Sequence, residues 1–299
     1  MNNIKLGIIG ADTSHSVAFT RLLNDSSHPY HVGGAQVERV FPGGSLEFLL
    51  SAQRVAGFVQ ELTSGHRLKI AESPEEIAAA CDGILLLSAD GRLHPAQLEA
   101  IAAARKPVYV DKPLALSARE AEEMIELAER FAFPLMSGSA VRFDESLKAV
   151  LDSISKIAGA DIAGPMPLEP TQNDLFWYGI HSAELLFAIM GDGCRDVTAY
   201  ERKDMLLIVG EWEDGRIGTI RGRLNGMGEF KAAVHHADGC ETVIIGSGGK
   251  PYYASLLEQV VRFFVTGHAA IPLWETIEIL RFLEAANTSR RTRGKVQVK

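Results

Sequence analysis

The first half of the chain alternates between short apolar runs and segments with helical spacing. One helical segment begins at Ser117 and has Glu120 three residues later, as in a capping box. The expected strands are Ile4–Gly10, Gln36–Phe41, Arg67–Ile70, Gly83–Ser88, Val108–Val110 and Pro134–Ser137, and the expected helices include Val17–Leu23, Leu46–Leu62, His94–Ala104 and Ser117–Phe131. This alternation predicts an α/β fold, a Rossmann-type doubly wound parallel sheet with right-handed crossovers.

The second half has a different pattern. Helices expected at Glu145–Ile157 and Phe176–Met190 flank a Gly- and Pro-rich connection from Gly159 to Pro170. Several alternating runs follow, and turns such as Asp214-Gly215 indicate antiparallel hairpins. The runs are Val197–Glu201, Met205–Glu213, Ile217–Arg223, Lys231–His235 and Glu241–Ile245. We therefore expect two domains, residues 1–140 and residues 141–299, the second an α+β domain with an open, mainly antiparallel sheet.

Composition excludes several classes of protein. The formal net charge of −8 argues against nucleic acid or an anionic membrane as the main partner. The three cysteines are widely spaced and form no CxxC pair, which favours a reducing, cytoplasmic location over a disulfide framework. No signal peptide and no apolar run of membrane-spanning length is expected. His235, His236, Asp238 and Cys240 are metal-ligand types, but Asp238-Gly239 reads more simply as a hairpin turn, so no metal site is predicted.

The stretch Val108–Pro113 places a lysine at the end of an apolar strand. Proline disfavours the helical region for the residue before it, so we expect Lys112 in extended geometry. In a parallel α/β sheet, ligands bind beyond the carboxyl ends of the strands. Lys112 is therefore a candidate site residue, although a lone lysine at this position is more often solvated.

The turn after the first strand lies where a dinucleotide fingerprint would be. Such a turn holds a pyrophosphate on backbone N–H groups at a helix N-terminus. Only Gly10 keeps the G-x-G-x-x-G pattern, because Asp12 and His15 occupy the second and third glycine positions. A carboxylate repels a pyrophosphate unless its side chain turns away from it, so an ordinary turn without a nucleotide is the alternative.

Other motifs extend this pattern along the chain. They are Gly7–Gly10, His94, Asp111–Pro113, Arg142–Phe143, Gly179–Glu184, Glu284–Ala286, Ser289 and Gly294–Val296. In order and spacing they resemble the Gfo/Idh/MocA oxidoreductases, named for glucose-fructose oxidoreductase and inositol dehydrogenase. Asp111–Pro113 resembles the family's Glu-Lys-Pro signature, with Asp in place of Glu. Gly179–Glu184 resembles its Asp-x-Gly-x-His-x-x-Asp helix, with Glu184 in place of the last Asp.

The resemblance implies an NAD- or NADP-dependent dehydrogenase acting on a sugar, cyclitol or related polyol. Lys112 would reach the nicotinamide and the substrate hydroxyl, and His181 would act as general base within the same cleft. Glu184, one helical turn beyond His181, could orient its imidazole. The implied cofactor-binding residues are Gly10, Ala11, Asp12, Thr13, Ser14, Ser88, His94, Asp111 and Lys112, and the implied substrate-binding residues are Arg142, Trp177, Tyr178 and Glu184.

Two departures from the family pattern bear on this function. Four residues before His181 the family usually has Asp, whereas this chain has Trp177. Trp177 and Tyr178 offer flat aromatic surfaces that suit a sugar ring or an aromatic substrate, and a place in the core is equally compatible with their spacing. The segment Val40–Ser45 has no carboxylate for a ribose 2′-OH, so NAD and NADP both remain open.

The sequence also predicts assembly and leaves alternative functions. Met205–Val209 is apolar on both faces of its expected strand, and helices can cover one face only, so we expect a homodimer or homotetramer through the second sheet. The altered glycine pattern leaves a non-catalytic ligand sensor or regulatory protein as the alternative. Lyase or hydrolase chemistry with a transiently used nicotinamide is a further possibility.

Overall fold

The computed structural model describes residues 3–298 and divides into two compact units. The first unit contains the residues up to Ala115, together with Arg119–Gly138 and Leu256–Leu273. The second contains Leu116–Ala118, Ser139–Ser255 and the residues from Trp274 onward. The chain therefore passes between the units several times, and the predicted domain boundary at residue 140 stays a prediction.

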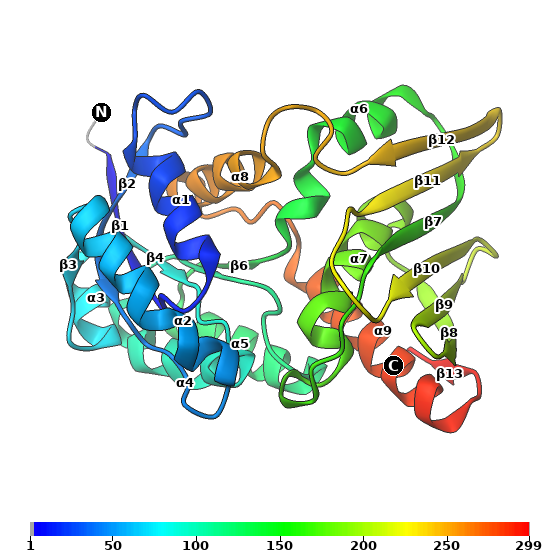
Figure 1. Ribbon diagram of the computed structural model, residues 1–299, viewed down its shortest axis with the longest axis horizontal. Helices are drawn as coiled ribbons and strands as arrows, with labels where there is room; N and C mark the ends of the chain where they lie inside the picture. Colours follow the sequence, from blue (N-terminus) through cyan, green and yellow to red (C-terminus); the bar gives the residue numbers. More distant parts are fainter. Residues whose placement is uncertain (1–2, 299) are drawn as a thin grey trace. The chain divides into compact units, whose positions relative to one another are not determined.

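The first unit is built on a six-stranded sheet with the strand order β3-β2-β1-β4-β5-β6, in which every pairing is parallel (Figure 1). The strands are β1 (Ile4–Ile9), β2 (Ala35–Phe41), β3 (Lys69–Ile70), β4 (Gly83–Leu86), β5 (Val108–Val110) and β6 (Leu135–Ser137). The helices are α1 (Ser14–Asn24), α2 (Leu49–Gln60), α3 (Pro74–Ala80), α4 (His94–Ile101) and α5 (Ala118–Phe131), with short helical turns η1 (Glu61–Gly65), η2 (Gly91–Leu93) and η3 (Ala102–Ala104). This strand order is that of a dinucleotide-binding fold, so the predicted doubly wound sheet is confirmed.

Local sequence explains these elements. All residues of β4 and β5 are buried, as expected for parallel strands covered on both faces. Ser73 caps α3, because its side chain accepts the Glu76 N–H, and Pro74 occupies the first helical turn. Thr13 caps α1 in the same way.

The carboxyl ends of β1, β2 and β4 meet closely at Gly10. Gly10 has a φ of +92°, and a Cβ atom built there would lie 2.4 Å from the backbone nitrogen of Ser88. On the other side, a Cβ atom on Gly43 would lie 3.2 Å from the Gly10 Cα atom. Neither the backbone angle nor the space at Gly10 accepts a side chain.

The second unit is built on a seven-stranded sheet with the order β12-β11-β7-β10-β9-β8-β13. Only β7 and β10 pair in parallel; the other pairings are antiparallel. The strands are β7 (Ile157–Pro165), β8 (Cys194–Arg202), β9 (Met205–Trp212), β10 (Ile217–Arg223), β11 (Lys231–His236), β12 (Gly239–Ile244) and β13 (Val296–Gln297). The remaining elements are η4 (Ala140–Phe143), α6 (Glu145–Ser153), η5 (Pro170–Gln172), α7 (Leu175–Met190) and α9 (Leu273–Thr292), and α8 (Tyr252–Thr266) links the two units.

Helix α7 is the core helix of the second unit. Twelve of its sixteen residues are buried, and it lies along β7 and β10. The Phe187 ring is 5.7 Å from the Trp212 ring of β9 and 5.6 Å from the Phe282 ring of α9. These aromatic contacts join the helix layer to the sheet and fix the position of α7.

One expectation for the second unit is wrong. The segment after Gly159, expected to be a loop, belongs to β7, the strand that lies between β10 and β11. Two positions of β7 require glycine because neighbouring atoms come close to the backbone. A Cβ atom on Gly159 would lie 2.7 Å from the Ile217 carbonyl oxygen, and one on Gly164 would lie 2.4 Å from the Phe230 ring. Pro165 is the last residue of the strand, where it interrupts little pairing.

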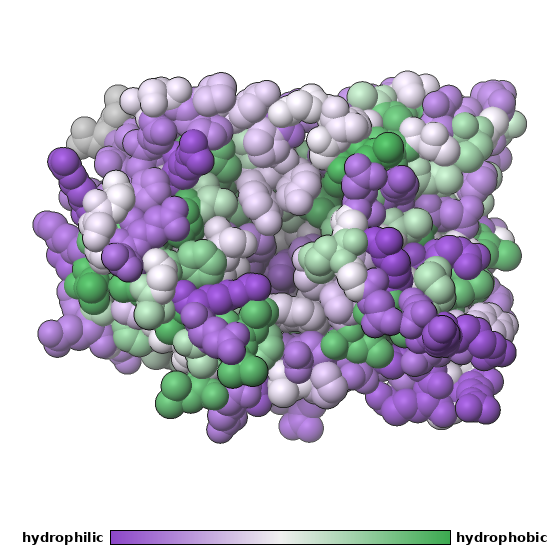
Figure 2. Space-filling view, viewed as in Figure 1, coloured by the Kyte–Doolittle hydropathy of each residue, from purple (hydrophilic) through white to green (hydrophobic). Residues whose placement is uncertain are grey.

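The surface in view is mostly polar, with apolar residues in scattered patches (Figure 2). Among the large apolar side chains, Leu46 and Leu49 are 95% and 69% exposed. Within residues 3–298, no helix is both long and apolar enough to cross a membrane. The cysteines Cys81, Cys194 and Cys240 are all free thiols.

The close packing at Gly10 leads to a stability prediction. We expect Gly10→Ala to lower the free energy of unfolding by about 2 kcal/mol or more, because the methyl group adds a backbone clash to an unfavourable φ. Gly57→Ala in α2 is the matched control: no atom lies within 4 Å of its Cβ position, and we expect a gain of roughly 0.5–1 kcal/mol. Urea denaturation of both variants measures the difference, and equal stabilities would contradict the prediction.

Candidate active site

The turn after β1 is the first part of the candidate site. The N–H of Gly10 donates to the Phe41 carbonyl at 3.0 Å, and that of Ala11 donates to the Pro42 carbonyl at 2.7 Å. Thr13 caps α1 by accepting the His15 N–H at 3.3 Å. Over residues 3–298, no hydrogen bond uses the N–H groups of Thr13 and Ser14, and Ser14 is exposed. These N–H groups, at the positive end of the α1 dipole, can bind an anion.

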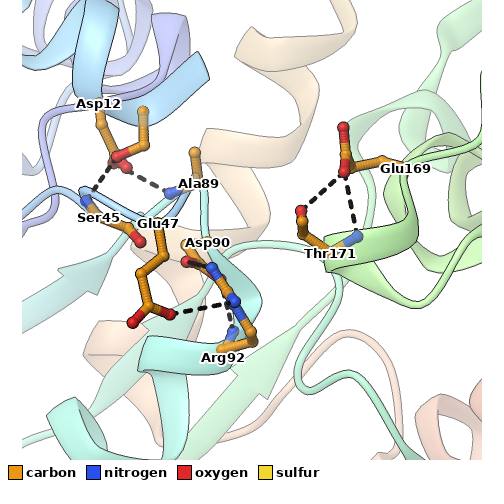
Figure 3. A network of polar contacts seen from close by, with 9 residues as sticks. Asp12, Ser45, Glu47, Ala89, Asp90, Arg92, Glu169 and Thr171 are labelled. Carbon is orange, nitrogen blue, oxygen red and sulfur yellow. Dashed lines mark hydrogen bonds and ion pairs between the residues drawn. The ribbon is translucent and has the colours of Figure 1, made fainter. Parts of the chain in front are cut away.

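Asp12 turns its side chain away from the surface of this turn. The residue is fully buried, and its Oδ1 atom accepts the Ala89 N–H at 3.0 Å, just beyond β4 (Figure 3). Its Oδ2 atom has no hydrogen-bond partner in the described part of the chain. The carboxylate therefore does not project outward beside the N–H groups of Thr13 and Ser14.

His15, the other replacement in the glycine pattern, forms a buried pair with Asp111 at the end of β5. Its Nδ1 atom lies 2.6 Å from the Asp111 Oδ2 atom, and its ring stacks on Phe19 at 5.3 Å. Burial alone would raise the pKa of Asp111, but the charge and hydrogen bond of His15 hold it well below its ordinary value. Asp111 is therefore an ionised carboxylate in the folded protein.

Lys112 follows directly, half-buried and joined to Pro113 by a cis peptide bond. His94 connects this segment to the end of β4. Its Nδ1 atom lies 3.1 Å from the carbonyl oxygens of Pro113 and Leu114, and its Nε2 atom lies 2.9 Å from that of Ser88. Because His94 is only 1% exposed, the geometry favours a role in holding Lys112 over direct contact with a cofactor.

The loop after β2 carries a carboxylate that is already paired. Glu47 lies 3.4 Å from Arg92 of η2, whose side chain also donates two hydrogen bonds to the buried Asp90 (Figure 3). The Ser45 N–H donates to the Ser51 hydroxyl at 2.7 Å. This loop therefore presents neither an unpaired carboxylate for a 2′-hydroxyl nor an unpaired cation for a 2′-phosphate.

In the second unit, His181 lies on α7 among aromatic rings. Its ring centroid is 5.2 Å from Tyr178 and 5.6 Å from Phe230, which packs over Gly164 of β7. The His181 Nδ1 atom is hydrogen-bonded to the Ser139 hydroxyl at 2.7 Å. His181 itself is half-buried.

Arg142 and Glu184 form a buried ion network that also includes Glu275 of α9. Arg142 donates to Glu184 at 2.6 Å and also to Glu275. Burial raises the pKa of Glu184, although Arg142 opposes that shift. The side chains of Arg142 and Glu184 bind each other within this network. The geometry therefore favours a structural role for both residues over the substrate contact that the family resemblance implies. Glu184 also accepts the Ser139 N–H at 3.2 Å, so it reaches His181 through Ser139 rather than directly.

Trp177 and Tyr178 are both half-buried, with their ring centroids 6.3 Å apart. Tyr178 also contacts His181 edge-on, whereas twelve of the other residues of α7 are buried. An accessible aromatic surface beside His181 is therefore present, which suits the stacking interpretation of these two residues.

Sequence reasoning missed three residues of this region: Ser139, Phe230 and Glu275. Each lies far along the chain from its partner, and neither spacing nor a local motif marks it. Gly164 is the only local hint for Phe230, since a glycine within a strand can indicate close approach of another group.

Comparison with known proteins identifies the first unit. Residues 4–138 match the family model described as the oxidoreductase family with an NAD-binding Rossmann fold, GFO_IDH_MocA. This segment belongs to the Gfo/Idh/MocA oxidoreductase family. The match confirms the predicted family, the nicotinamide cofactor and the class of NAD(P)-dependent dehydrogenases. No curated protein sequence matches the chain significantly.

Solved structures share the fold of the whole chain. A myo-inositol dehydrogenase from Corynebacterium glutamicum is 15% identical with a TM-score of 0.78, covering 100% of this chain and 99% of its own. An apo scyllo-inositol dehydrogenase from Lactobacillus casei is 15% identical with a TM-score of 0.77, covering 99% and 98%. An Agrobacterium radiobacter oxidoreductase in complex with NAD+, L-tartaric acid and magnesium is 14% identical with a TM-score of 0.77, covering 99% of both chains.

The residues of the first turn fit a dinucleotide. Gly10 keeps the tight turn, and Asp12 is buried against Ala89 instead of beside the phosphates. The N–H groups of Thr13 and Ser14 are the groups that would hold the pyrophosphate. The two glycine replacements are therefore compatible with cofactor binding.

The His15–Asp111 pair predicts a pH-dependent contribution to stability. Because the pKa of Asp111 is lowered by folding, the pair stabilises the protein above the unfolded value of about 3.9, and this contribution is lost as the pH falls below it. We expect His15→Gln to cost about 3 kcal/mol at pH 7, since a buried carboxylate loses its partner. The difference in the free energy of unfolding between His15→Gln and the wild type should hold from pH 7 to about 4 and narrow as the pH falls below that value.

Urea denaturation at a series of pH values measures this difference. Lys148→Gln is the matched control, because it breaks an exposed ion pair with Asp152 and should cost less than about 0.5 kcal/mol. A difference for His15→Gln that stays constant as the pH falls from 4 to about 2 would mean that His15 contributes through packing alone.

Proposed function

We propose that this NAD(P)-dependent oxidoreductase transfers a hydride between its cofactor and a hydroxyl or carbonyl carbon of a sugar, cyclitol or related polyol. The observation that carries the proposal is the lysine at the carboxyl end of β5, within a segment that belongs to an NAD-binding family. Inositol dehydrogenases among the structures of the same fold support the substrate class.

Lys112 and His181 are the residues proposed to assist proton transfer. The nicotinamide, when bound, supplies or accepts the hydride at the reacting carbon. Lys112, held by His94 through the Pro113–Leu114 carbonyls, provides a cation that stabilises developing charge on the substrate oxygen. His181 provides an imidazole for the same oxygen, and the rings of Tyr178 and Phe230 restrict water around it.

For the cofactor, we propose that Gly10, Ala11, Asp12, Thr13 and Ser14 form the pyrophosphate turn. Ser88 and Asp111 are buried, and we propose that they support it from the ends of β4 and β5. NAD and NADP are both retained as the cofactor, since Glu47 and Arg92 neutralise each other. A cytoplasmic location is proposed from the three free cysteines.

A fluorescence titration with NADH and with NADPH, followed by a panel of polyols and keto sugars, tests the proposal. We expect binding of at least one nicotinamide cofactor and turnover of at least one member of the panel. Absence of binding at millimolar cofactor would favour the alternative, a non-catalytic ligand sensor.

Variants at the two proposed residues test their roles. We expect Lys112→Ala and His181→Ala each to lower kcat/KM by about a hundredfold or more, as loss of a positioned polar group does in other enzymes. Lys106→Ala is the control, because Lys106 precedes the same strand but lies outside the proposed site. Unchanged turnover in both site variants, with folding intact by circular dichroism, would contradict the assignment.

We also propose that the chain assembles through the open face of its second sheet. In β9, Leu206 and Ile208 are buried, whereas Leu207 and Val209 on the opposite face remain half-exposed. Tyr200 of β8 lies opposite Leu207 in the register and is 53% exposed. This unpartnered apolar face supports a homodimer or homotetramer.

Sedimentation analysis at micromolar concentration tests the assembly. We expect the wild type to sediment as a dimer or tetramer and Leu207→Glu to shift it toward the monomer, because a carboxylate at a packed sheet face is desolvated. Val265→Glu is the matched control, an exposed apolar residue on α8. A monomeric wild type would remove this proposal.

A further inference from the structure

Ser139 occupies a position where its side chain would normally cap a helix, yet it does not. It is the N-cap residue of η4 and makes no side-chain capping bond. Its hydroxyl instead lies 2.7 Å from the Nδ1 atom of His181 on α7. Ser139 is 0% exposed, so bulk water does not reach the hydroxyl.

The backbone of Ser139 is fixed by the neighbouring ion network. Its N–H donates to the Glu184 Oε1 atom at 3.2 Å, while the Glu184 Oε2 atom accepts from Arg142 at 2.6 Å. Arg142 is held in turn by Glu275. The hydroxyl therefore has a defined place relative to His181, because residues from η4, α7 and α9 hold it there.

Burial decides which of the two groups donates. In the described part of the chain, His181 Nδ1 is the one hydrogen-bond partner of the Ser139 hydroxyl. If Nδ1 carried the proton, the hydroxyl would accept it and its own O–H would be left buried without an acceptor. An unsatisfied buried donor is costly enough to shift the equilibrium between the two neutral imidazole tautomers by roughly tenfold or more. The favourable arrangement has the Ser139 O–H donating to an unprotonated Nδ1.

We propose that Ser139 is a positioning residue that donates to Nδ1 of His181 and so keeps the proton of the neutral imidazole on Nε2. This inference rests on the proposed function and refines it. In this tautomer the Nε2–H of neutral His181 is a donor that would stabilise negative charge on the substrate oxygen during hydride transfer. The general-base role that the family resemblance implies would require the opposite tautomer, in which Nε2 carries no proton.

The chain's departure from the family pattern agrees with this role. A carboxylate four residues before His181 could accept an imidazole N–H and favour the imidazolium, but that position is Trp177. The nearest carboxylate in the ion network, Glu184, is already paired with Arg142. A neutral hydroxyl is the group that meets Nδ1.

The tautomer is measurable without any catalytic assay. Long-range 1H–15N correlation spectra of the full chain, with 15N-labelled histidine and at about pH 9, separate Nε2–H from Nδ1–H imidazoles, since the ordinary histidine pKa is about 6.5. His181→Gln identifies the His181 signals among those of the nine histidines. We expect the wild type to show the Nε2–H form by roughly tenfold or more, and Ser139→Ala to show a mixture of both forms.

Ser182→Ala is the matched control, because Ser182 adjoins His181 on α7 and its buried hydroxyl has no hydrogen-bond partner in the described residues. We expect its spectrum to match the wild type. A wild-type Nδ1–H form, or a Ser139→Ala spectrum equal to that of the wild type, would overturn the proposal. The spectra are recorded without cofactor or substrate, so they do not depend on enzymatic activity. The proposal for Ser139 and the proposed function can therefore fail independently of each other.

Discussion

The structure of the first unit depends on the close packing of three strand ends around Gly10. Atoms of Ser88 leave no volume for a side chain on Gly10, and the φ of +92° is one that glycine adopts without strain. The turn is therefore tied to the end of β2 by hydrogen bonds and to the end of β4 by contact, and from there the chain passes into α1. That path leads the N–H groups of Thr13 and Ser14 to the ligand edge of the parallel sheet.

The two lost glycines follow from the same packing. Asp12 is tolerated because its carboxylate turns to the Ala89 N–H, and His15 is tolerated because Asp111 accepts its ring N–H. Asp111 is itself a departure, standing where the family signature has Glu. The shorter side chain and the histidine meet at 2.6 Å, so two departures that look independent in the sequence form one interaction. A chain that lacks two glycines of the G-x-G-x-x-G pattern can thus still form the turn that is typical of that pattern.

Sequence pattern predicted the first sheet and the hairpins of the second, because periodic burial of apolar residues determines both. It missed β7, since Gly159, Gly164 and Pro165 are typical of loops, and only the neighbouring strands and the Phe230 ring explain them. The place of Lys112 just beyond the end of β5 was predictable from its strand and the following proline. Ser139 was not, because its partner lies 42 residues away and no local rule links a serine N-cap to a histidine on another helix.

In the second unit, the buried charged side chains near His181 are paired with one another. Arg142, Glu184 and Glu275 are buried together, and each charge is satisfied within the group, as a buried ion network requires. The neutral Ser139 connects this network to His181 and fixes position without adding charge. An aspartate in the place of Trp177 would instead bring a carboxylate to the imidazole. The loss of one carboxylate and the pairing of another therefore leave a neutral hydroxyl at Nδ1 of His181, and the direction of that hydrogen bond determines which ring nitrogen carries the proton.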